Sequence, residues 1–285
     1  MRGCPRVAMM PAVRLGRLAG WRAMPGAVRL CRRACPRLHD GLEHALADLV
    51  GCVEGVMTPT VLITGAGRGI GLELVRVYHE RGARVLAVHR PGLVVPEALL
   101  AMQAAHPDRM RLIPLDVRAT SVVVNLAARL SERIDILINT TGMLMGTGYA
   151  PGGNMVGGGI RSTLQVNATG PLFVAQAALS NMTRGGKIAT ILPIGDVHSL
   201  DLLDNDARQA AKAAVVRVMQ SLASDIKPAG VAVALIHPGA VGPTEDGGVA
   251  PLSLTDSAHG IAKVIDELTL ETSGRFFRFD GSAER

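Results

Sequence analysis

From residue 60 onward, short apolar and β-branched runs alternate with longer stretches whose apolar positions recur at helical spacing. The short runs predict six strands, at 60–64, 84–88, 111–115, 134–139, 187–192 and 231–236. The longer stretches predict helices at 69–82, 96–105, 119–132, 160–182, 206–226 and 255–269. Because the strands are too apolar to have a solvated face and alternate strictly with helices, we expect an α/β fold with a doubly wound parallel sheet.

Two further segments refine this picture without changing the fold class. The run RFFRF at 275–279 could add a strand at the edge of the sheet. The glycine-rich segment GTGYAPGGNMVGGG at 146–159 is typical of a mobile loop. No internal repeat interrupts the alternation, so we expect residues 57–285 to form one domain.

The first 56 residues differ in composition from the rest of the chain. Residues 1–38 contain nine arginines, no lysine and no acidic residue, whereas the formal net charge of the whole chain is only +6. Three interpretations remain open for residues 1–56. They are a basic, disordered or weakly helical extension, which would be an over-long start if translation begins near Met57; a targeting segment; or an arm that binds nucleic acid. Nucleic acid is the least favoured partner, because a single tryptophan is the only aromatic residue among these arginines.

Cysteine usage and hydropathy bear on the cellular compartment of the protein and on whether it binds a metal. All four cysteines lie within the first 52 residues, so residues 57–285 need no disulfide and offer no thiolate metal site. No apolar run reaches the roughly 18 residues that span a bilayer. We therefore expect a cytoplasmic protein with no membrane segment and no bound metal.

The first predicted strand leads directly into the glycine-rich sequence TGAGRGIGLEL. Gly65, Gly69 and Gly71 follow that strand and open a helix, where the chain has to turn tightly and approach a pyrophosphate closely. The free N–H groups and the positive dipole end of the helix then face the anion. The glycines together with Arg68 and Ile70 in the same loop predict a Rossmann-type dinucleotide site.

The residue type at the end of the second strand bears on the choice of cofactor. A site for NAD(H) places an acidic residue there, which holds the ribose 2′-hydroxyl. This chain has no acid in RGARVLAVHRPGLVVP, but Arg90 closes the strand and Arg68 lies in the glycine loop. Two guanidinium groups suit a 2′-phosphate, which favours NADP(H) over NAD(H), although both arginines could instead be solvated loop residues.

Taken together, these residues resemble the short-chain dehydrogenase/reductase family over about residues 58–281. TGAGRGIG fits the pattern TGxxxGxG, LDV at 115–117 resembles the segment that reaches the adenine, and INTTG at 138–142 resembles the NNAG segment. HPGAVGPT at 237–244 resembles the segment that holds the nicotinamide, and SGRFFRFDG is similar to the C-factor-like and carbonyl-reductase-like branch. Besides the glycine loop and Arg90, the resemblance implies these cofactor-binding residues: Asp116, Val117, Asn139, Gly142, Lys212, Pro238, Gly239, Val241 and Thr244.

The family's chemistry uses an asparagine, a serine, a tyrosine and a lysine. VNATGPLFVAQAAL places Asn167 at the asparagine position, and Lys212 matches the lysine. The tyrosine position, four residues before the lysine, is occupied by Arg208, and the expected serine pair is Leu192-Pro193. A guanidinium stays protonated far above neutral pH and cannot exchange a proton there, so Arg208 cannot replace the phenol.

Two functions therefore remain open. The first is a weak or altered oxidoreductase that acts on a small carbonyl or alcohol, for which His198 is either a replacement acid or a solvated loop residue. The second is a catalytically silent NADP(H)-binding protein that acts as a sensor or dimer partner. The resemblance also implies a homodimer or tetramer formed through the helices at 160–182 and 206–226.

Overall fold

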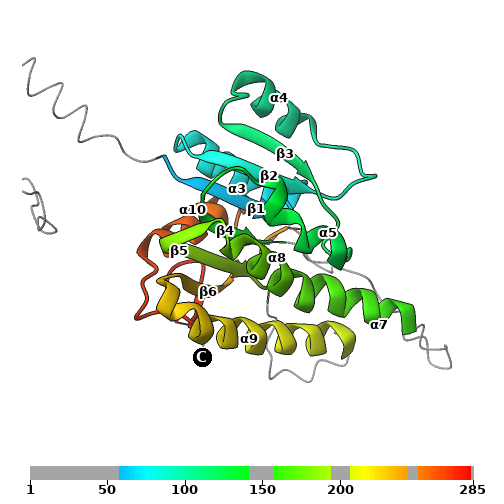
Figure 1. Ribbon diagram of the computed structural model, residues 1–285, viewed down its shortest axis with the longest axis vertical. Helices are drawn as coiled ribbons and strands as arrows, with labels where there is room; N and C mark the ends of the chain where they lie inside the picture. The colour runs from blue at the N-terminus through cyan, green and yellow to red at the C-terminus, as the bar shows by residue number, and fades with distance from the viewer. Residues whose placement is uncertain (1–57, 141–156, 194–205, 243–249, 284–285) are drawn as a thin grey trace, which may run out of the picture. The chain divides into compact units, whose positions relative to one another are not determined.

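The structure is a computed structural model that describes residues 58–140, 157–193, 206–242 and 250–283 (Figure 1). Seven parallel strands form one sheet in the order β3-β2-β1-β4-β5-β6-β7. The strands are β1 Thr60–Thr64, β2 Arg84–His89, β3 Met110–Pro114, β4 Ile134–Asn139, β5 Met182–Ile191, β6 Ala232–His237 and β7 Phe276–Arg278. The order reverses between β1 and β4, and ligands of open α/β sheets bind at the carboxyl ends of the strands at such a point.

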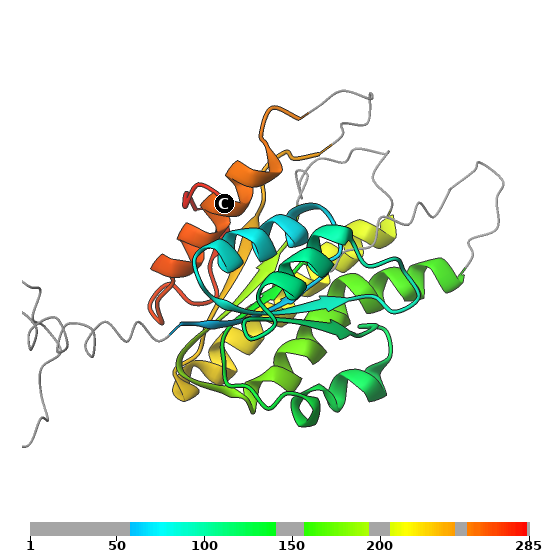
Figure 2. The same ribbon diagram turned by 90° about the horizontal axis from the view of Figure 1, so that it is seen from above.

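Helices cover both faces of the sheet (Figure 2). One face carries α3 Gly69–Glu80, α4 Glu97–Ala105 and α10 Leu254–Glu267. The other carries α5 Thr120–Val124, α6 Leu126–Arg129, the π-helical turn η1 Gln165–Thr169, α8 Gly170–Leu179 and α9 Asp206–Ile226. Within the described ranges, no helix is long and apolar enough to cross a membrane.

Alternating strand residues supply two separate hydrophobic cores. Leu62 of β1 packs into the core beneath α8 and α9, whereas its neighbours Val61 and Ile63 pack into the core beneath α3 and α10. Both cores are fully covered, which explains why the strands are continuously apolar. The predicted doubly wound parallel sheet is confirmed, and so is the edge strand within 275–279.

The predicted helix at 160–182 is confirmed as a helical segment, but it runs over 157–179 and contains a π-helical turn. The chain forms α7 Gly157–Leu164, then the π-helical turn η1, then α8, and β5 already begins at Met182. Pro171 at the start of α8 has no N–H to donate to the preceding turn, and the turn is widened there. Gly170 lets η1 close upon it, since a Cβ on Gly170 would lie 2.9 Å from the carbonyl oxygen of Gln165.

Two other predicted segments also differ from the structure. The helix expected at 119–132 is divided into α5 and α6, because the run SVVV is rich in β-branched residues that lose side-chain freedom in a helix. The loop expected at 146–159 ends three residues early, since α7 begins at Gly157. The rest of that segment lies outside the described residues.

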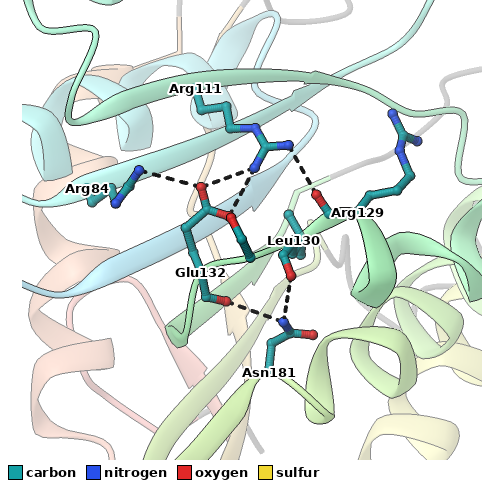
Figure 3. Close-up of polar contacts among 7 residues, drawn as sticks. Arg84, Arg111, Arg129, Leu130, Glu132 and Asn181 are labelled. Carbon is teal, nitrogen blue, oxygen red and sulfur yellow. Dashed lines mark hydrogen bonds and ion pairs between the residues drawn. The ribbon is translucent and has the colours of Figure 1, made fainter.

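The buried carboxylate of Glu132 links the amino ends of several strands, opposite the carboxyl ends at which ligands of such sheets bind. Glu132, whose side chain is 8 % exposed, accepts hydrogen bonds from Arg111 Nη1 at 3.1 and 3.0 Å and lies 3.6 Å from Arg84 Nη2 (Figure 3). Asn181 Nδ2 donates to the carbonyl oxygens of Leu130 and Glu132. These contacts join β2, β3 and the segment before β4 to the segment before β5.

Candidate functional site

The glycine loop lies at the carboxyl end of β1, where the strand order reverses. Gly65 and Gly69 have φ angles of +68° and +55°, a left-handed conformation that glycine adopts without strain. The helix α3 begins at Gly69, and the N-cap residue Arg68 makes no side-chain hydrogen bond to its first turn. The N–H groups of that turn are therefore not capped by a side chain, and such a helix terminus binds anions.

Gly71 brings α3 very close to the strand ends. A Cβ at this position would lie 2.3 Å from the carbonyl oxygen of Gly65 and 2.6 Å from Thr140 Oγ1. The Thr140 hydroxyl donates to the carbonyl of Thr64, and the Thr140 N–H donates to Thr64 Oγ1 at 3.2 Å. Thr64 and Thr140 hold the loop from below, and neither residue was predicted from the sequence. The alternation of strands alone does not show which residues lie beneath a loop.

Asn139 joins the loop region to the helix layer on the other face. Its side chain is 2 % exposed, Nδ2 donates to the carbonyl of Pro171 at 3.2 Å, and Oδ1 accepts from Thr64 Oγ1 at 3.4 Å. Its polar atoms are thus engaged within the protein, between β1, β4 and α8. In this structure Asn139 supports the site from inside rather than facing outward.

A cluster of charged residues lies beyond the ends of β2 and β3. Arg118 Nε contacts both carboxylate oxygens of Asp116 at 3.0 and 3.1 Å, and its backbone N–H donates to Asp116 Oδ1 at 3.0 Å. Arg90 Nε lies 3.8 Å from Asp116 Oδ2. The hydrogen bonds from Arg118 lower the pKa of the Asp116 carboxyl and outweigh its partial burial. Arg90 and Asp116 were predicted from the sequence as site residues, whereas Arg118 was not.

The remaining residues of the adenine and phosphate end have different surroundings. Arg68 is exposed, and Ile70 packs in part against the core beneath α3. Val117 is 7 % exposed and lies against α8, where a Cβ on Gly170 would be 3.2 Å from Val117 Cγ2. Val117 therefore anchors the loop after β3 while Asp116 faces outward.

Asn167 and Lys212 lie on neighbouring elements. Asn167 is in η1 and Lys212 is in α9, these two elements pack together, and both residues are partly buried. π-Helical turns are rare and frequently occur at functional sites. Arg208 lies one turn before Lys212 in α9, but its side chain is outside the described part of the structure.

The position expected to hold a serine belongs to the hydrophobic core. Leu192 is 6 % exposed and packs in the core beneath α8 and α9, and its N–H donates to the carbonyl of Ile236 at 2.9 Å. Pro193 follows it and is exposed. The end of β5 therefore presents neither a hydroxyl nor a titratable group at these two positions.

The loop after β6 is held by one buried serine and by close packing. Ser257 Oγ of α10 donates to the carbonyl of Pro238 at 2.6 Å, and Gly239 N–H donates to His237 Nδ1 at 2.9 Å. Gly239 has a φ of +80°, and a Cβ there would lie 2.5 Å from Leu252 Cδ2. Val241 continues this loop and pairs with Leu252 through a β-bridge. The predicted residues Gly142, Thr244 and His198 lie outside the described residues.

The fold and this edge of the sheet define a Rossmann-type α/β protein whose glycine loop is shaped for a dinucleotide. The sequence profile described as short chain dehydrogenase matches residues 59–248. The chain therefore belongs to the short-chain dehydrogenase/reductase family.

Individual relatives agree with this assignment. A 1-hydroxy-2-glutathionyl-2-methyl-3-butene dehydrogenase from Rhodococcus sp. (strain AD45) is 30% identical over 78% of this chain and 97% of its own length. C-signal from Myxococcus xanthus is 32% identical over 52% of this chain and 90% of its own length. The crystal structure of a carbonyl reductase from Pseudomonas aeruginosa PAO1 in complex with NADP has a TM-score of 0.69 and is 29% identical. That match covers 80% of this chain and 99% of the reductase.

Proposed function

We propose that this protein binds NADP(H) at the carboxyl edge of the sheet and is a slow or altered oxidoreductase for a small carbonyl or alcohol. The observation that carries the cofactor part is the uncapped first turn of α3, packed against the strands through Gly71, with Arg90 at the end of β2. The similar carbonyl reductase from P. aeruginosa, whose crystal structure is a complex with NADP, supports a nicotinamide cofactor. The family resemblance also assigns Gly142, Pro238, Gly239, Val241 and Thr244 to the cofactor.

The cofactor would supply the hydride, so the chain has to bind and orient both partners and move one proton. Lys212 carries a cation toward the ribose in this proposal, and Asn167 lies on η1, which packs against α9. The proton transfer is the difficult step, because the arginine at position 208 and the aliphatic side chain at position 192 cannot donate or accept a proton there. Loss of a positioned acid costs typically about 10²–10⁴-fold in rate.

A second candidate follows from the same observation. Since Leu192 is packed in the core and Arg208 cannot exchange a proton, the protein could bind NADP(H) without turnover and act as a sensor or dimer partner. The two candidates share the cofactor and differ only in chemistry. One set of assays can therefore separate them.

The experiment uses the purified full chain. Calorimetric titration with NADPH and NADH tests the cofactor, and binding of neither would refute both candidates. A panel of aldehydes, ketones and quinones then tests turnover in the natural protein, in Arg208→Tyr and in the Leu192→Ser/Pro193→Ser variant. We expect slow turnover that Arg208→Tyr increases. Turnover at ordinary rates of about 1–10³ s⁻¹ in the natural protein would contradict a damaged site, and none in any variant would favour the silent binder.

We further propose a homodimer or tetramer assembled through α8 and α9. These helices pack together and keep the partly exposed apolar residues Phe173, Ala177 and Val216, which suits close helix approach. Light scattering coupled to size-exclusion chromatography measures the mass directly, and a monomer at micromolar concentration would contradict the proposal. The cysteine-free sequence after residue 52 favours a reducing, cytoplasmic location.

A further inference from the structure

Asp116 has almost all of its hydrogen-bonding capacity taken by one neighbour. Arg118 approaches the carboxylate with Nε, Nη2 and its own backbone N–H, and Nη2 reaches Oδ2 at 2.5 Å. An ionised carboxylate offers about four lone-pair sites, and a guanidinium fork fits two of them at once. Asp116 is therefore held as a carboxylate anion that is already paired with Arg118.

Arg90, in contrast, is not hydrogen-bonded to Asp116 in this arrangement. Its Nε is 3.8 Å from Asp116 Oδ2, which is beyond hydrogen-bond distance, and its side chain is 49 % exposed. Within the described residues the Arg90 guanidinium donates no hydrogen bond and its side chain is half exposed, so a planar anion could take two of its five donors. If Arg118 did not occupy Asp116, that carboxylate would compete for Arg90 and repel a phosphate nearby.

From these contacts we propose that Arg118 determines cofactor specificity by sequestering Asp116, which leaves Arg90 available for the 2′-phosphate of NADP(H). This inference rests on the proposed NADP(H) binding at the same edge of the sheet. Arg118 is a positioning residue, because it acts through Asp116 and not on the reacting atoms. The net charge of the cluster supports the assignment: two arginines and one aspartate leave one positive charge for a phosphate.

The test measures the dissociation constants of NADPH, NADH and adenosine 2′-phosphate for the full chain and three variants. In Arg118→Gln we expect NADPH and adenosine 2′-phosphate to bind about tenfold more weakly, equivalent to one charge-assisted hydrogen bond, while NADH changes by less than about threefold. In the double variant Arg118→Gln/Asp116→Asn, the ratio of the NADPH affinity to the NADH affinity should return to within about threefold of that of the natural protein, because any contact of Asp116 with the adenine acts on both coenzymes alike. Rescue is the readout that a merely structural role would not produce.

Arg133→Gln is the matched control, because Arg133 also pairs with an aspartate, Asp135 at 3.2 Å, but at the amino end of β4, away from the carboxyl ends of the strands. It should leave all three dissociation constants unchanged. Equal weakening of NADPH and NADH by Arg118→Gln, an unchanged affinity ratio, or no rescue by the double variant would each overturn the inference. Natural protein that binds neither coenzyme would refute the proposed function itself, whereas a preference for NADPH that survives Arg118→Gln refutes only the role of Arg118.

Discussion

The hydroxyl of Thr140 occupies the space beside Gly71, where a Cβ would lie only 2.6 Å from Thr140 Oγ1. The same Cβ would lie 2.3 Å from the carbonyl oxygen of Gly65, which belongs to the backbone and cannot turn away. The start of α3 is thus pressed against the ends of β1 and β4 at a distance that only glycine permits. This contact places the first turn of the helix where an anion could reach it.

Gly71→Ala should therefore destabilise the protein and weaken cofactor binding. We expect a loss of about 1–3 kcal/mol in the free energy of unfolding, typical of an extra methyl group in a packed site. The control is Gly67→Ala in the same loop, because a Cβ there has no atom within 4 Å, and it should change stability by less than about 0.5 kcal/mol. Urea unfolding measures both, and equal stabilities would show that α3 can move away without cost.

Arg90→Glu should reverse the preference between coenzymes. The change removes charge-assisted hydrogen bonds to a 2′-phosphate and places a carboxylate near Asp116, so NADPH should bind at least about tenfold more weakly relative to NADH. Arg184→Glu is the control, since Arg184 is an exposed arginine near the start of β5, at the opposite edge of the sheet. An unchanged ratio of dissociation constants in Arg90→Glu would remove Arg90 from the phosphate site.

The Glu132 carboxylate should stabilise the fold at neutral pH and lose that effect in acid. Burial alone would raise the pKa of Glu132, but the hydrogen bonds from Arg111 and the charge of Arg84 outweigh burial and lower it. A carboxyl whose pKa is depressed by folding contributes stability above its unfolded pKa and loses it as the pH falls through the folded pKa. Glu132→Gln should therefore cost about 1–3 kcal/mol at pH 7.

Chemical denaturation at pH 7 and at about pH 3 checks this sign, because the two proteins should converge in stability when Glu132 is protonated. The control is Glu267→Gln, since Glu267 and Lys263 are 4.0 Å apart and both well exposed. Such surface pairs contribute about 0–1 kcal/mol. A difference between natural protein and Glu132→Gln that persists undiminished at about pH 3 would contradict the assignment.

Thr190→Val should leave the free energy of unfolding unchanged or raise it by up to about 1 kcal/mol. Thr190 is 2 % exposed, and within the described residues its hydroxyl has no hydrogen-bond partner. Valine has the same shape, favours strands and carries no polar atom to desolvate. Thermal unfolding followed by circular dichroism measures the effect.

Ser257→Ala is the contrasting variant, because the Ser257 hydroxyl is equally buried but donates to Pro238. It should lose about 1–2 kcal/mol, since the carbonyl of Pro238 is left without that donor. If Thr190→Val cost as much as Ser257→Ala, the Thr190 hydroxyl would have to be engaged in the folded protein.

The candidate site could be predicted in part because some of its signals are local. Gly65, Gly69 and Gly71 lie where a strand ends and a helix begins, within a dozen residues, and the sequence itself shows this tight strand-to-helix turn. Arg118 was open to the same reasoning, since it stands two residues after Asp116. Its role nevertheless depends on Arg90 lying across from it, which the pairing of β2 with β3 brings about.

The sequence by itself determined the parallel α/β fold, the position of the glycine loop and the family, because strand and helix periodicity act over a few residues. Only the tertiary structure decided that Leu192 is buried in the core and that Thr140 supports Gly71. These features arise where segments distant in the chain meet, and close packing between elements depends on atoms that no local pattern contains.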